Sequence, residues 1–367
     1  MVLDDAEWME IALRLADRNI GNVFPNPSVG CIIINDGRIV GRGWTQEGGR
    51  PHAEVMALEQ AGEKSVGATV YTTLEPCSHF GKTPPCSDAL ISGRIERLVG
   101  AMKDPDPRVD GMGFVKLKDA GIEVVEGILE REAEELNRGF ITRLKKKLPF
   151  VTLKMAMSID SRIATKTYDS QWITGEEARH SSHFLRSKHD AILTGIGTVL
   201  ADNPFLNTRI SGLENRSPIR IILDTNLRIP SDSQIVSTAA KHETIIFTTV
   251  AAGETKKKQL ESFGLQIITI NGDKSGRVSL IEALRSIAKK GINSILVECG
   301  GTLCTEFIKS NLIDEFLVYR APIVLGGDGI AAVEGFGVSD LSAAPNFKLT
   351  GITRLGADTL ESYKRQI

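Results

Sequence analysis

Three side chains of the kinds that bind zinc lie in the first quarter of the chain, with one acidic side chain beside them. His52 stands two residues before Glu54, and eight residues separate Cys77 from Cys86. One imidazole and two thiolates are suited to tetrahedral zinc, and three protein ligands leave the fourth position to water, as in catalytic zinc sites. The sequence therefore predicts a zinc site held by His52, Cys77 and Cys86.

Glu54 offers the proton-transfer group that such a site needs. A water molecule on zinc can lose its proton near neutral pH, and a neighbouring carboxylate can accept that proton and return it to a leaving amine. Glu54 follows His52 at the start of a helix predicted over residues 53–61. We therefore expect Glu54 to be the catalytic residue of a hydrolytic deamination.

Two alternatives use the same residues. The three ligands could form a structural zinc site, for which His79 offers a fourth ligand, or they could be unrelated residues of the core. A structural site normally has four protein ligands and has no need of Glu54, so we favour the catalytic site. We then expect His79 to lie near the substrate.

The order of these residues resembles that of the zinc-dependent cytidine-type deaminases. Their signature reads His-x-Glu, then Pro-Cys and a second Cys with two residues between the cysteines, whereas this chain has the eight residues 78–85 between its cysteines. That insertion, with the motifs at 25–30, 73–79 and 82–86, resembles the deaminase domain of the bifunctional riboflavin-biosynthesis enzymes. The resemblance implies deamination of a phosphorylated pyrimidine.

The same resemblance implies two substrate contacts in the first half of the chain. Asn26 would hydrogen-bond the pyrimidine, and Lys82 would lie near the phosphate-bearing tail. Thr45 follows Trp44 where many family members have His after an aromatic residue, so the family's contact at this position is replaced by something else here.

The remaining residues carry features of a second, phosphate-binding site. Gly300 and Gly301 lie between a predicted strand at 294–298 and a predicted helix at 303–310, where free N–H groups and a helix N-terminus favour a phosphate. Arg186 and Arg209 offer positive charge. A glycine pair after a strand is more often only a tight turn, and this spacing is not the Gly-x-Gly-x-x-Gly fingerprint of dinucleotide sites.

Four further segments, at 153–162, 170–174, 202–204 and 297–300, resemble the reductase of the riboflavin pathway. The resemblance implies a dihydrofolate-reductase-like fold that uses NADPH. The implied nucleotide contacts are Ala156, Trp172, Thr198, Asp202, Thr225, Gly300, Gly301, Thr302, Leu303, Cys304, Thr305 and Glu306. The implied contacts to the phosphorylated substrate are Lys154, Ser170, Arg186, Leu206, Arg209 and Glu298. Ser161 departs from the family, which commonly has Gly there, and this difference affects a turn rather than the chemistry.

Strand and helix signals alternate along both halves, which predicts a mixed α/β fold. The basic run before Pro149 ends a charged helical stretch, so we expect two domains, 1–147 and 148–367. By resemblance these are a cytidine-deaminase-like α/β/α domain and a dihydrofolate-reductase-like α/β domain. The predicted strands are 29–34, 38–43, 69–74, 97–101, 122–125, 150–157, 191–194, 219–224, 244–248, 266–270, 294–298 and 315–323. The predicted helices are 5–18, 53–61, 86–92, 114–120, 176–187, 280–290 and 303–310.

Composition narrows the classes of protein that remain. The net charge of −2 offers no basic surplus for nucleic acid or an anionic membrane. The acidic N-terminus and an odd number of cysteines indicate a cytoplasmic protein without a disulfide framework. We expect Cys31, Cys299 and Cys304 to be core thiols rather than a redox or metal pair, and His180 and His183 to lie on a solvated helix face.

The resemblance covers the whole chain and implies two successive reactions. The first is hydrolytic deamination of 2,5-diamino-6-ribosylamino-4(3H)-pyrimidinone 5′-phosphate, and the second is NADPH-dependent reduction of the ribosyl group to a ribityl group. It also implies a homo-oligomer, a dimer or tetramer. Two rivals remain: a deaminase of free nucleotides or of a tRNA base, which leaves the second half unexplained, and a non-enzymatic zinc-stabilised nucleotide-binding protein.

Overall fold

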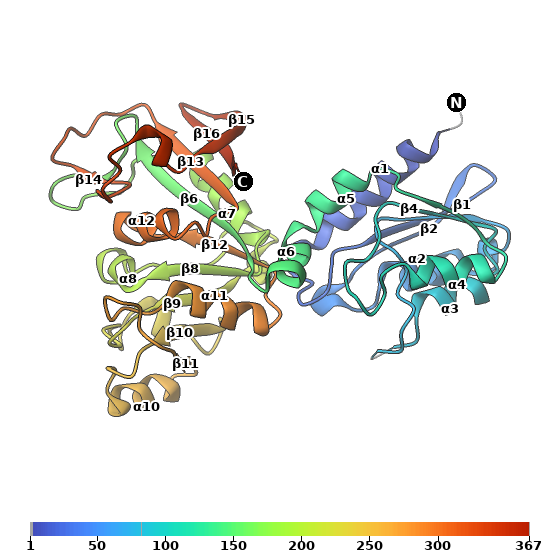
Figure 1. The fold of residues 1–367 in the computed structure, drawn as a ribbon, viewed down its shortest axis with the longest axis horizontal. Coiled ribbons are helices and arrows are strands. Elements are labelled where there is room, and N and C mark those ends of the chain that lie inside the picture. Colours follow the sequence, from blue (N-terminus) through green and yellow to red (C-terminus); the bar gives the residue numbers. More distant parts are fainter. Residues whose placement is uncertain (1–2, 82, 367) are drawn as a thin grey trace. The chain divides into compact units, whose positions relative to one another are not determined.

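The computed structural model of the chain describes residues 3–81 and 83–366. The chain separates after Leu148 into two units, Met1–Leu148 and Pro149–Ile367, and each contains its own sheet and helices (Figure 1). No helix in these described ranges is both long enough and apolar enough to cross a membrane.

The first unit is built on a five-stranded mixed sheet in the order β2-β1-β3-β4-β5. Strand β1 runs antiparallel to β2 and β3, whereas β3, β4 and β5 are parallel. The apolar run in β1 is buried on both faces, which places it in the middle of the core. The strands are β1 (Gly30–Asn35), β2 (Arg38–Trp44), β3 (Thr69–Thr72), β4 (Arg97–Gly100) and β5 (Glu123–Glu126).

Six helices accompany this sheet. The first begins at a capping box, in which the Asp4 carboxylate accepts the Glu7 N–H and the Glu7 carboxylate accepts the Asp4 N–H, each at 2.9 Å. The helices are α1 (Asp5–Ala16), α2 (Ala53–Ala61), α3 (Cys86–Ser92), α4 (Met112–Asp119), α5 (Glu130–Leu136) and α6 (Arg138–Lys146).

Glycines let helices α1 and α2 touch the backbone of the sheet. A Cβ atom on Gly30 would lie 1.9 Å from the Ala12 carbonyl oxygen of α1, and one on Gly43 would lie 1.9 Å from the Ala53 carbonyl oxygen of α2. Gly43 pairs with the residue that follows Gly30 in β1. Because neighbouring residues of a strand face opposite sides, the two helices pack on opposite faces of the sheet.

The second unit is built on a nine-stranded sheet in the order β11-β10-β9-β8-β12-β6-β13-β16-β15. The strands from β11 to β13 are parallel, whereas β16 is antiparallel to β13 and β15 is antiparallel to β16. A separate pair joins β7 (Arg162–Ala164) to β14 (Ile330–Ala331). The sheet consists of β6 (Phe150–Ser158), β8 (Ala191–Gly195), β9 (Ile219–Leu223), β10 (Thr244–Thr248), β11 (Gln266–Thr269), β12 (Ser294–Glu298), β13 (Glu315–Ala321), β15 (Phe347–Leu355) and β16 (Asp358–Arg365).

The parallel strands bring their carboxyl ends to one edge of the sheet, where the helices that follow them begin. The helices of this unit are α7 (Glu176–Ser187), α8 (Ile196–Asp202), α9 (Gln234–Ser237), α10 (Glu254–Ser262), α11 (Leu280–Lys289) and α12 (Gly301–Lys309). The predicted mixed α/β fold is confirmed, and every predicted element is present with ends within two residues of the prediction. The charged helical stretch expected before Pro149 contains α5 and α6, whose bounds were not predicted; α8, α9, α10, the β7–β14 pair and the β15–β16 hairpin were not predicted at all.

Ser161 occupies a turn that suits glycine better than serine. Its φ is 61°, in the left-handed region, which costs an L-residue about 1 kcal/mol. We expect Ser161→Gly to raise the free energy of unfolding by up to about 1 kcal/mol, since the strain is removed at some cost in unfolded-state entropy. Urea unfolding of the full chain measures this difference. Ser161→Ala keeps the Cβ atom and should bring no gain, and a destabilised Ser161→Gly protein would contradict the prediction.

Candidate functional site

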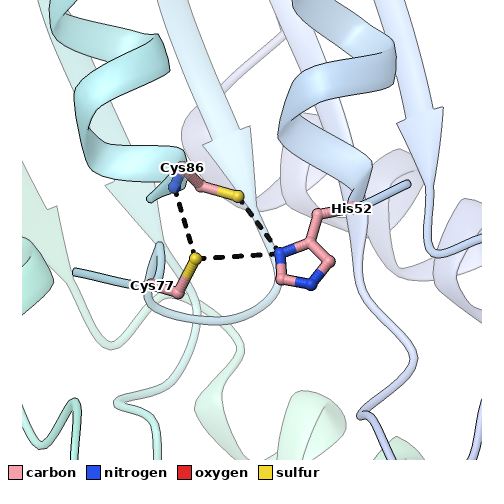
Figure 2. Close-up of side chains that lie close together, drawn as sticks. All are labelled: His52, Cys77 and Cys86. Atoms are coloured by element: carbon pink, nitrogen blue, oxygen red, sulfur yellow. Dashed lines mark hydrogen bonds between the residues drawn. The ribbon is translucent and has the colours of Figure 1, made fainter. Parts of the chain in front are cut away.

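The three predicted zinc ligands meet in the first unit (Figure 2). His52 precedes the first residue of α2, Cys77 lies in the loop after β3, and Cys86 begins α3. The His52 Nδ1 atom lies 3.2 Å from the Cys86 Sγ atom and 3.7 Å from the Cys77 Sγ atom. Among the described residues, no other group of three or more His, Cys, Asp or Glu side chains gathers in this way.

The cluster has the donor set and the spacing that zinc requires. Bond lengths of about 2.0 Å to nitrogen and about 2.3 Å to sulfur place tetrahedral ligand atoms about 3.5 Å apart, close to the two distances observed. The Cys86 N–H donates to the Cys77 Sγ atom at 3.2 Å. Hydrogen bonds from the Cys86 side chain, from His52 and from this N–H lower the pKa of the Cys77 thiol to about 4, which favours the thiolate form that binds metal.

Glu54 lies in the first turn of α2 with only 4% of its surface exposed. Burial raises the pKa of its carboxyl, and the carboxyl interacts with His52, Cys77 and Cys86. A buried carboxyl beside a cluster of metal-binding side chains has the position required of a proton-transfer group.

The acidic residue two positions before Cys77 has a structural task that the sequence analysis did not find. Glu75 is 2% exposed, and its carboxylate accepts the N–H groups of Asp104, Gly111 and Gly113 at 3.0, 2.9 and 2.7 Å. These bonds tie the segment that carries Cys77 to the loop after β4 and to the first turn of α4. The sequence signal was present, because Glu75 belongs to the motif at 73–79, but its partners lie some 30 residues away along the chain.

The other residues predicted for this site differ in their placement. Asn26 donates from Nδ2 to the Gly49 carbonyl oxygen at 2.8 Å. The Thr45 hydroxyl is buried and accepts the Val29 N–H at 2.9 Å, so this side chain serves the strand rather than a ligand. His79 lies outside the group of metal-binding side chains, which agrees with the expectation that it is no ligand. Lys82 lies outside the described residues.

A cavity of about 1580 Å³ opens in the second unit at the carboxyl ends of the parallel strands. Almost all residues predicted for the second site line it. They are Lys154, Ala156, Ser170, Trp172, Arg186, Thr198, Asp202, Leu206, Arg209, Thr225, Glu298, Gly300, Gly301, Thr302, Leu303 and Glu306.

Two predicted nucleotide contacts, Cys304 and Thr305, do not line this cavity. Cys304 is fully buried, and the Thr305 hydroxyl donates to the Gly301 carbonyl oxygen while accepting the Glu334 N–H. Both side chains therefore lie on the inner face of α12. The first turn of α12 packs tightly, because a Cβ atom on Gly301 would lie 2.5 Å from the Ala331 carbonyl oxygen.

One carboxylate holds two cations in the wall of the cavity. Glu298 accepts hydrogen bonds from Arg186 Nε at 2.8 Å and Arg186 Nη2 at 3.0 Å, and the Lys154 Nζ atom lies 3.6 Å away. Burial opposes ionisation of Glu298, but the charges of Arg186 and Lys154 outweigh burial and hold its pKa well below the usual range. Burial lowers the pKa of the Lys154 ammonium.

The structure corrects two expectations for this unit. His183 was expected on a solvated helix face, but it is half-buried and borders the cavity. The reason is that the side of α7 that carries His183 faces the loop at 203–217. Cys299 also lines the cavity instead of lying in the core, whereas Cys31 and Cys304 are core thiols. All five cysteines are free.

Comparison with known proteins matches both units to described families. Residues 3–102 match the cytidine and deoxycytidylate deaminase zinc-binding region, and residues 149–360 match the RibD C-terminal domain. The riboflavin biosynthesis protein RibD of Escherichia coli is 41% identical over 97% of this chain and 98% of its own length. The protein of the same name from Aquifex aeolicus is 39% identical over 98% of both chains.

Solved structures agree over nearly the full length. RibD of Acinetobacter baumannii has a TM-score of 0.89 at 36% identity and covers 99% of both chains. A diaminohydroxyphosphoribosylaminopyrimidine deaminase/5-amino-6-(5-phosphoribosylamino)uracil reductase from Thermotoga maritima has a TM-score of 0.86 at 35% identity over 98% of both chains.

The contact between Gly43 and α2 provides a test of how the metal cluster is held. A side chain at Gly43 would push against the Ala53 carbonyl oxygen, which lies between His52 and Glu54 in the chain. Overpacking of this kind costs about 1–3 kcal/mol, so we expect Gly43→Ala to weaken zinc binding by about tenfold or more. Competition with a chelator, combined with elemental analysis, measures the affinity.

Gly351→Ala is the matched control, because a Cβ atom at Gly351 meets no other atom within 4 Å. Zinc affinity should be unchanged in this variant. Full zinc affinity in Gly43→Ala would show that α2 can shift without moving the ligands.

Proposed function

The chain belongs to the RibD family of bifunctional riboflavin-biosynthesis deaminase/reductases, and on this premise we propose which residues carry each reaction. The family membership confirms the predicted fold class, a cytidine-deaminase-like domain followed by a dihydrofolate-reductase-like domain. We assign deamination to residues 1–147 and reduction to residues 148–367. This division is supported by the two matched regions, which fall on either side of residue 147.

In the first domain, we propose that His52, Cys77 and Cys86 hold zinc. Zinc bound there would lower the pKa of a water molecule at the open fourth position. Glu54 would take up a proton of the attacking water, whose oxygen would form a bond to the ring carbon as the carbon–amine bond breaks. Glu54 then returns the proton to the departing amine, which leaves as ammonia. The substrate is 2,5-diamino-6-ribosylamino-4(3H)-pyrimidinone 5′-phosphate, with Asn26 against the pyrimidine.

In the second domain, the cavity takes NADPH and the deaminated product together. When bound there, NADPH would supply the hydride for C1′ of the ring-opened ribosyl group, which gives the ribitylamino product. A proton must accompany the hydride, and the Lys154 ammonium and the Asp202 carboxyl both border the cavity. Glu298 keeps Lys154 and Arg186 in place through its ion pairs.

The remaining cavity residues divide by ligand. We assign to the nucleotide Ala156, Trp172, Thr198, Asp202, Thr225 and the segment 300–306. We assign to the substrate Lys154, Ser170, Arg186, Leu206, Arg209 and Glu298. These assignments are supported by the position of the residues around one cavity that is large enough for both NADPH and the substrate. Cys304 and Thr305 do not line this cavity with their side chains, so they would contribute only backbone atoms.

The observation that carries the proposal is the buried Glu54 beside a His-Cys-Cys cluster, in a domain separate from the cavity. The test is to incubate the protein with the diaminopyrimidine phosphate, with and without NADPH, and to follow ammonia and NADPH absorbance. We expect ammonia in both reactions and NADPH consumption only after ammonia is released. Turnover of cytidine compounds without any use of NADPH would favour the rival nucleotide deaminase.

We further propose a cytoplasmic homo-oligomer, a dimer or tetramer. The five free cysteines suit a reducing compartment, and light scattering of the purified protein measures the number of copies. A monomer at micromolar concentration would contradict the proposed assembly.

Substitution of Glu54 separates catalysis from metal binding. Glu54→Gln keeps the shape of the side chain but cannot accept the proton, so we expect ammonia release to fall about 10²–10⁴-fold while zinc content stays at one ion per chain. Glu59→Gln, on an exposed position of the same helix, should retain full activity. Loss of zinc from Glu54→Gln in elemental analysis would give Glu54 a structural role instead.

Substitution of Asp202 tests the independence of the two sites. Asp202→Asn removes a carboxyl that borders the cavity of the second unit, so we expect NADPH oxidation to slow by about tenfold or more. Ammonia release by the same protein serves as the internal control and should be unchanged. An equal loss of both activities in separate assays would count against two independent sites.

A further inference from the structure

Among the cations that line the cavity, Lys154, Arg186 and Arg209 form a group that interacts with the charge of one carboxylate, Glu298. Lys154 and Arg186 both pair with Glu298, whereas Arg209 forms no ion pair with any carboxylate in the part of the chain that the structure describes. The group therefore carries a surplus of two positive charges. A phosphate monoester carries about −1.5 to −2 charges at neutral pH, so a bound phosphate would balance the surplus.

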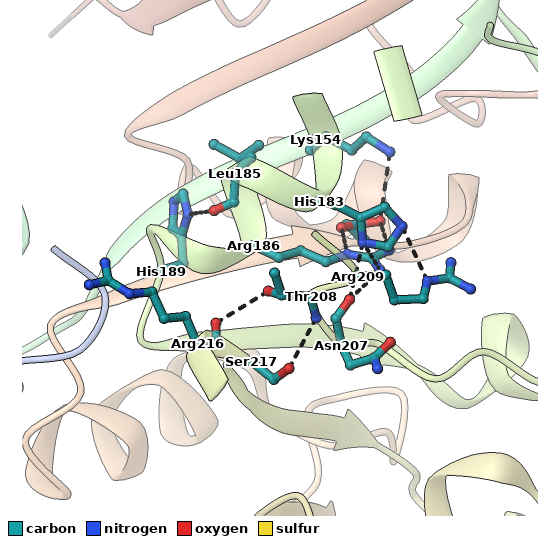
Figure 3. Close-up of polar contacts among 11 residues, drawn as sticks. Lys154, His183, Leu185, Arg186, His189, Asn207, Thr208, Arg209, Arg216 and Ser217 are labelled. Carbon is teal, nitrogen blue, oxygen red and sulfur yellow. Dashed lines mark hydrogen bonds and ion pairs between the residues drawn. The ribbon is translucent and has the colours of Figure 1, made fainter. Parts of the chain in front are cut away.

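The Arg209 guanidinium is held by a neutral ring rather than by an acid (Figure 3). The Arg209 Nε atom donates to the His183 Nε2 atom at 3.3 Å. On the other side of the ring, the His183 Nδ1 atom lies 3.2 Å from the Asn207 carbonyl oxygen. Arg186 Nη1 also lies 3.5 Å from Nδ1, but the carbonyl oxygen is nearer and can only accept, while Arg209 can only donate. The tautomer that satisfies both of these contacts has its proton on Nδ1 and the lone pair of Nε2 facing Arg209.

The same carbonyl oxygen links this ring to the second arginine. Arg186 Nη1 donates to the Asn207 carbonyl oxygen at 3.0 Å, and Arg186 lies one helical turn after His183 on α7. His183 thus joins α7, which carries Arg186, to the loop that carries Arg209. Both arginines are held near each other despite their like charges.

Burial and the neighbouring charges keep the His183 ring neutral. Burial first, and then the charges of Arg186 and Arg209, lower the pKa of His183 to about 4, against smaller opposing effects of the Asn207 carbonyl oxygen and of Glu298. Lys154, on the far side of Glu298, adds positive charge. A protonated ring would lose the lone pair that accepts from Arg209, so the neutral state is the one that can hold the guanidinium.

We propose that His183 is a positioning residue of the reductase, which holds Arg209 through its Nε2 atom and thereby directs the free Nη groups of Arg209 at the phosphate of the substrate. The inference rests on the proposed function, because it takes Arg209 to be a substrate contact.

The test is steady-state reductase kinetics on the full-length protein, with the phosphorylated substrate and with its dephosphorylated nucleoside. We expect His183→Ala to raise KM for the phosphorylated substrate about tenfold, the effect of about 1.4 kcal/mol of binding free energy. The kcat, the KM for NADPH and turnover of the nucleoside should change less than about threefold. His183→Gln, whose amide can both donate and accept, should recover part of the loss.

A double-mutant cycle with Arg209→Ala separates the possible failures. If His183 acts through Arg209, adding His183→Ala to Arg209→Ala should raise KM no further. An unchanged KM in Arg209→Ala would overturn the proposed substrate contact itself. If Arg209→Ala raises KM but His183→Ala has no effect, only the role of His183 is overturned. The same holds if His183→Ala has its full effect both with and without Arg209.

Phe184→Ala is the matched control for α7, since this neighbouring side chain is 48% exposed and does not line the cavity. Its kinetic constants should equal those of the unaltered protein. Thermal unfolding of each variant identifies any loss of fold, and His183→Gln decides the outcome if His183→Ala does not fold.

Discussion

The contact between the backbone of β2 and the first turn of α2 is the constraint on which the metal site depends. Gly43 allows the Ala53 carbonyl oxygen to approach closer than any side chain permits. Because His52 and Glu54 flank Ala53, this contact sets the distance of both from the sheet. Cys77 follows β3 and Cys86 begins α3. The three ligands therefore meet only if α2 and α3 keep fixed distances from the sheet.

The second unit meets a different physical requirement, which is to keep charge in a cavity without letting the charges cancel. Arg186 and Glu298 have side chains only 13% and 14% exposed, and a buried charge is tolerated when it is paired and hydrogen-bonded. Glu298 pairs with the charges of Arg186 and Lys154. The neutral His183 ring accepts a hydrogen bond from Arg209 without neutralising the charge of its guanidinium. The wall is therefore ordered before a ligand arrives and still attracts an anion.

The sequence predicted functional residues best where only a few residue types can perform the chemistry. Few residues bind zinc, so His52, Cys77 and Cys86 could be recognised from type and spacing, and buried apolar strands such as β12 were found with their ends. The role of His183 could not be predicted, because two histidines three residues apart on a charged helix look like a solvated face. Its partners depend on how α7 lies against a loop some 25 residues away. Strand β15 escaped prediction because its residues are nearly all exposed and a register shift between Leu349 and Gly351 interrupts its apolar alternation.

The three hydrogen bonds to the Glu75 carboxylate have a consequence for how the first unit opens. One buried side chain joins the segment of Cys77 to Asp104, Gly111 and Gly113. If the loop detaches, a buried carboxylate loses its partners, which is costly, so the ligand segment and the loop open as one cooperative unit. Amide hydrogens at these three positions thus report on the integrity of the metal site, although none of them touches it.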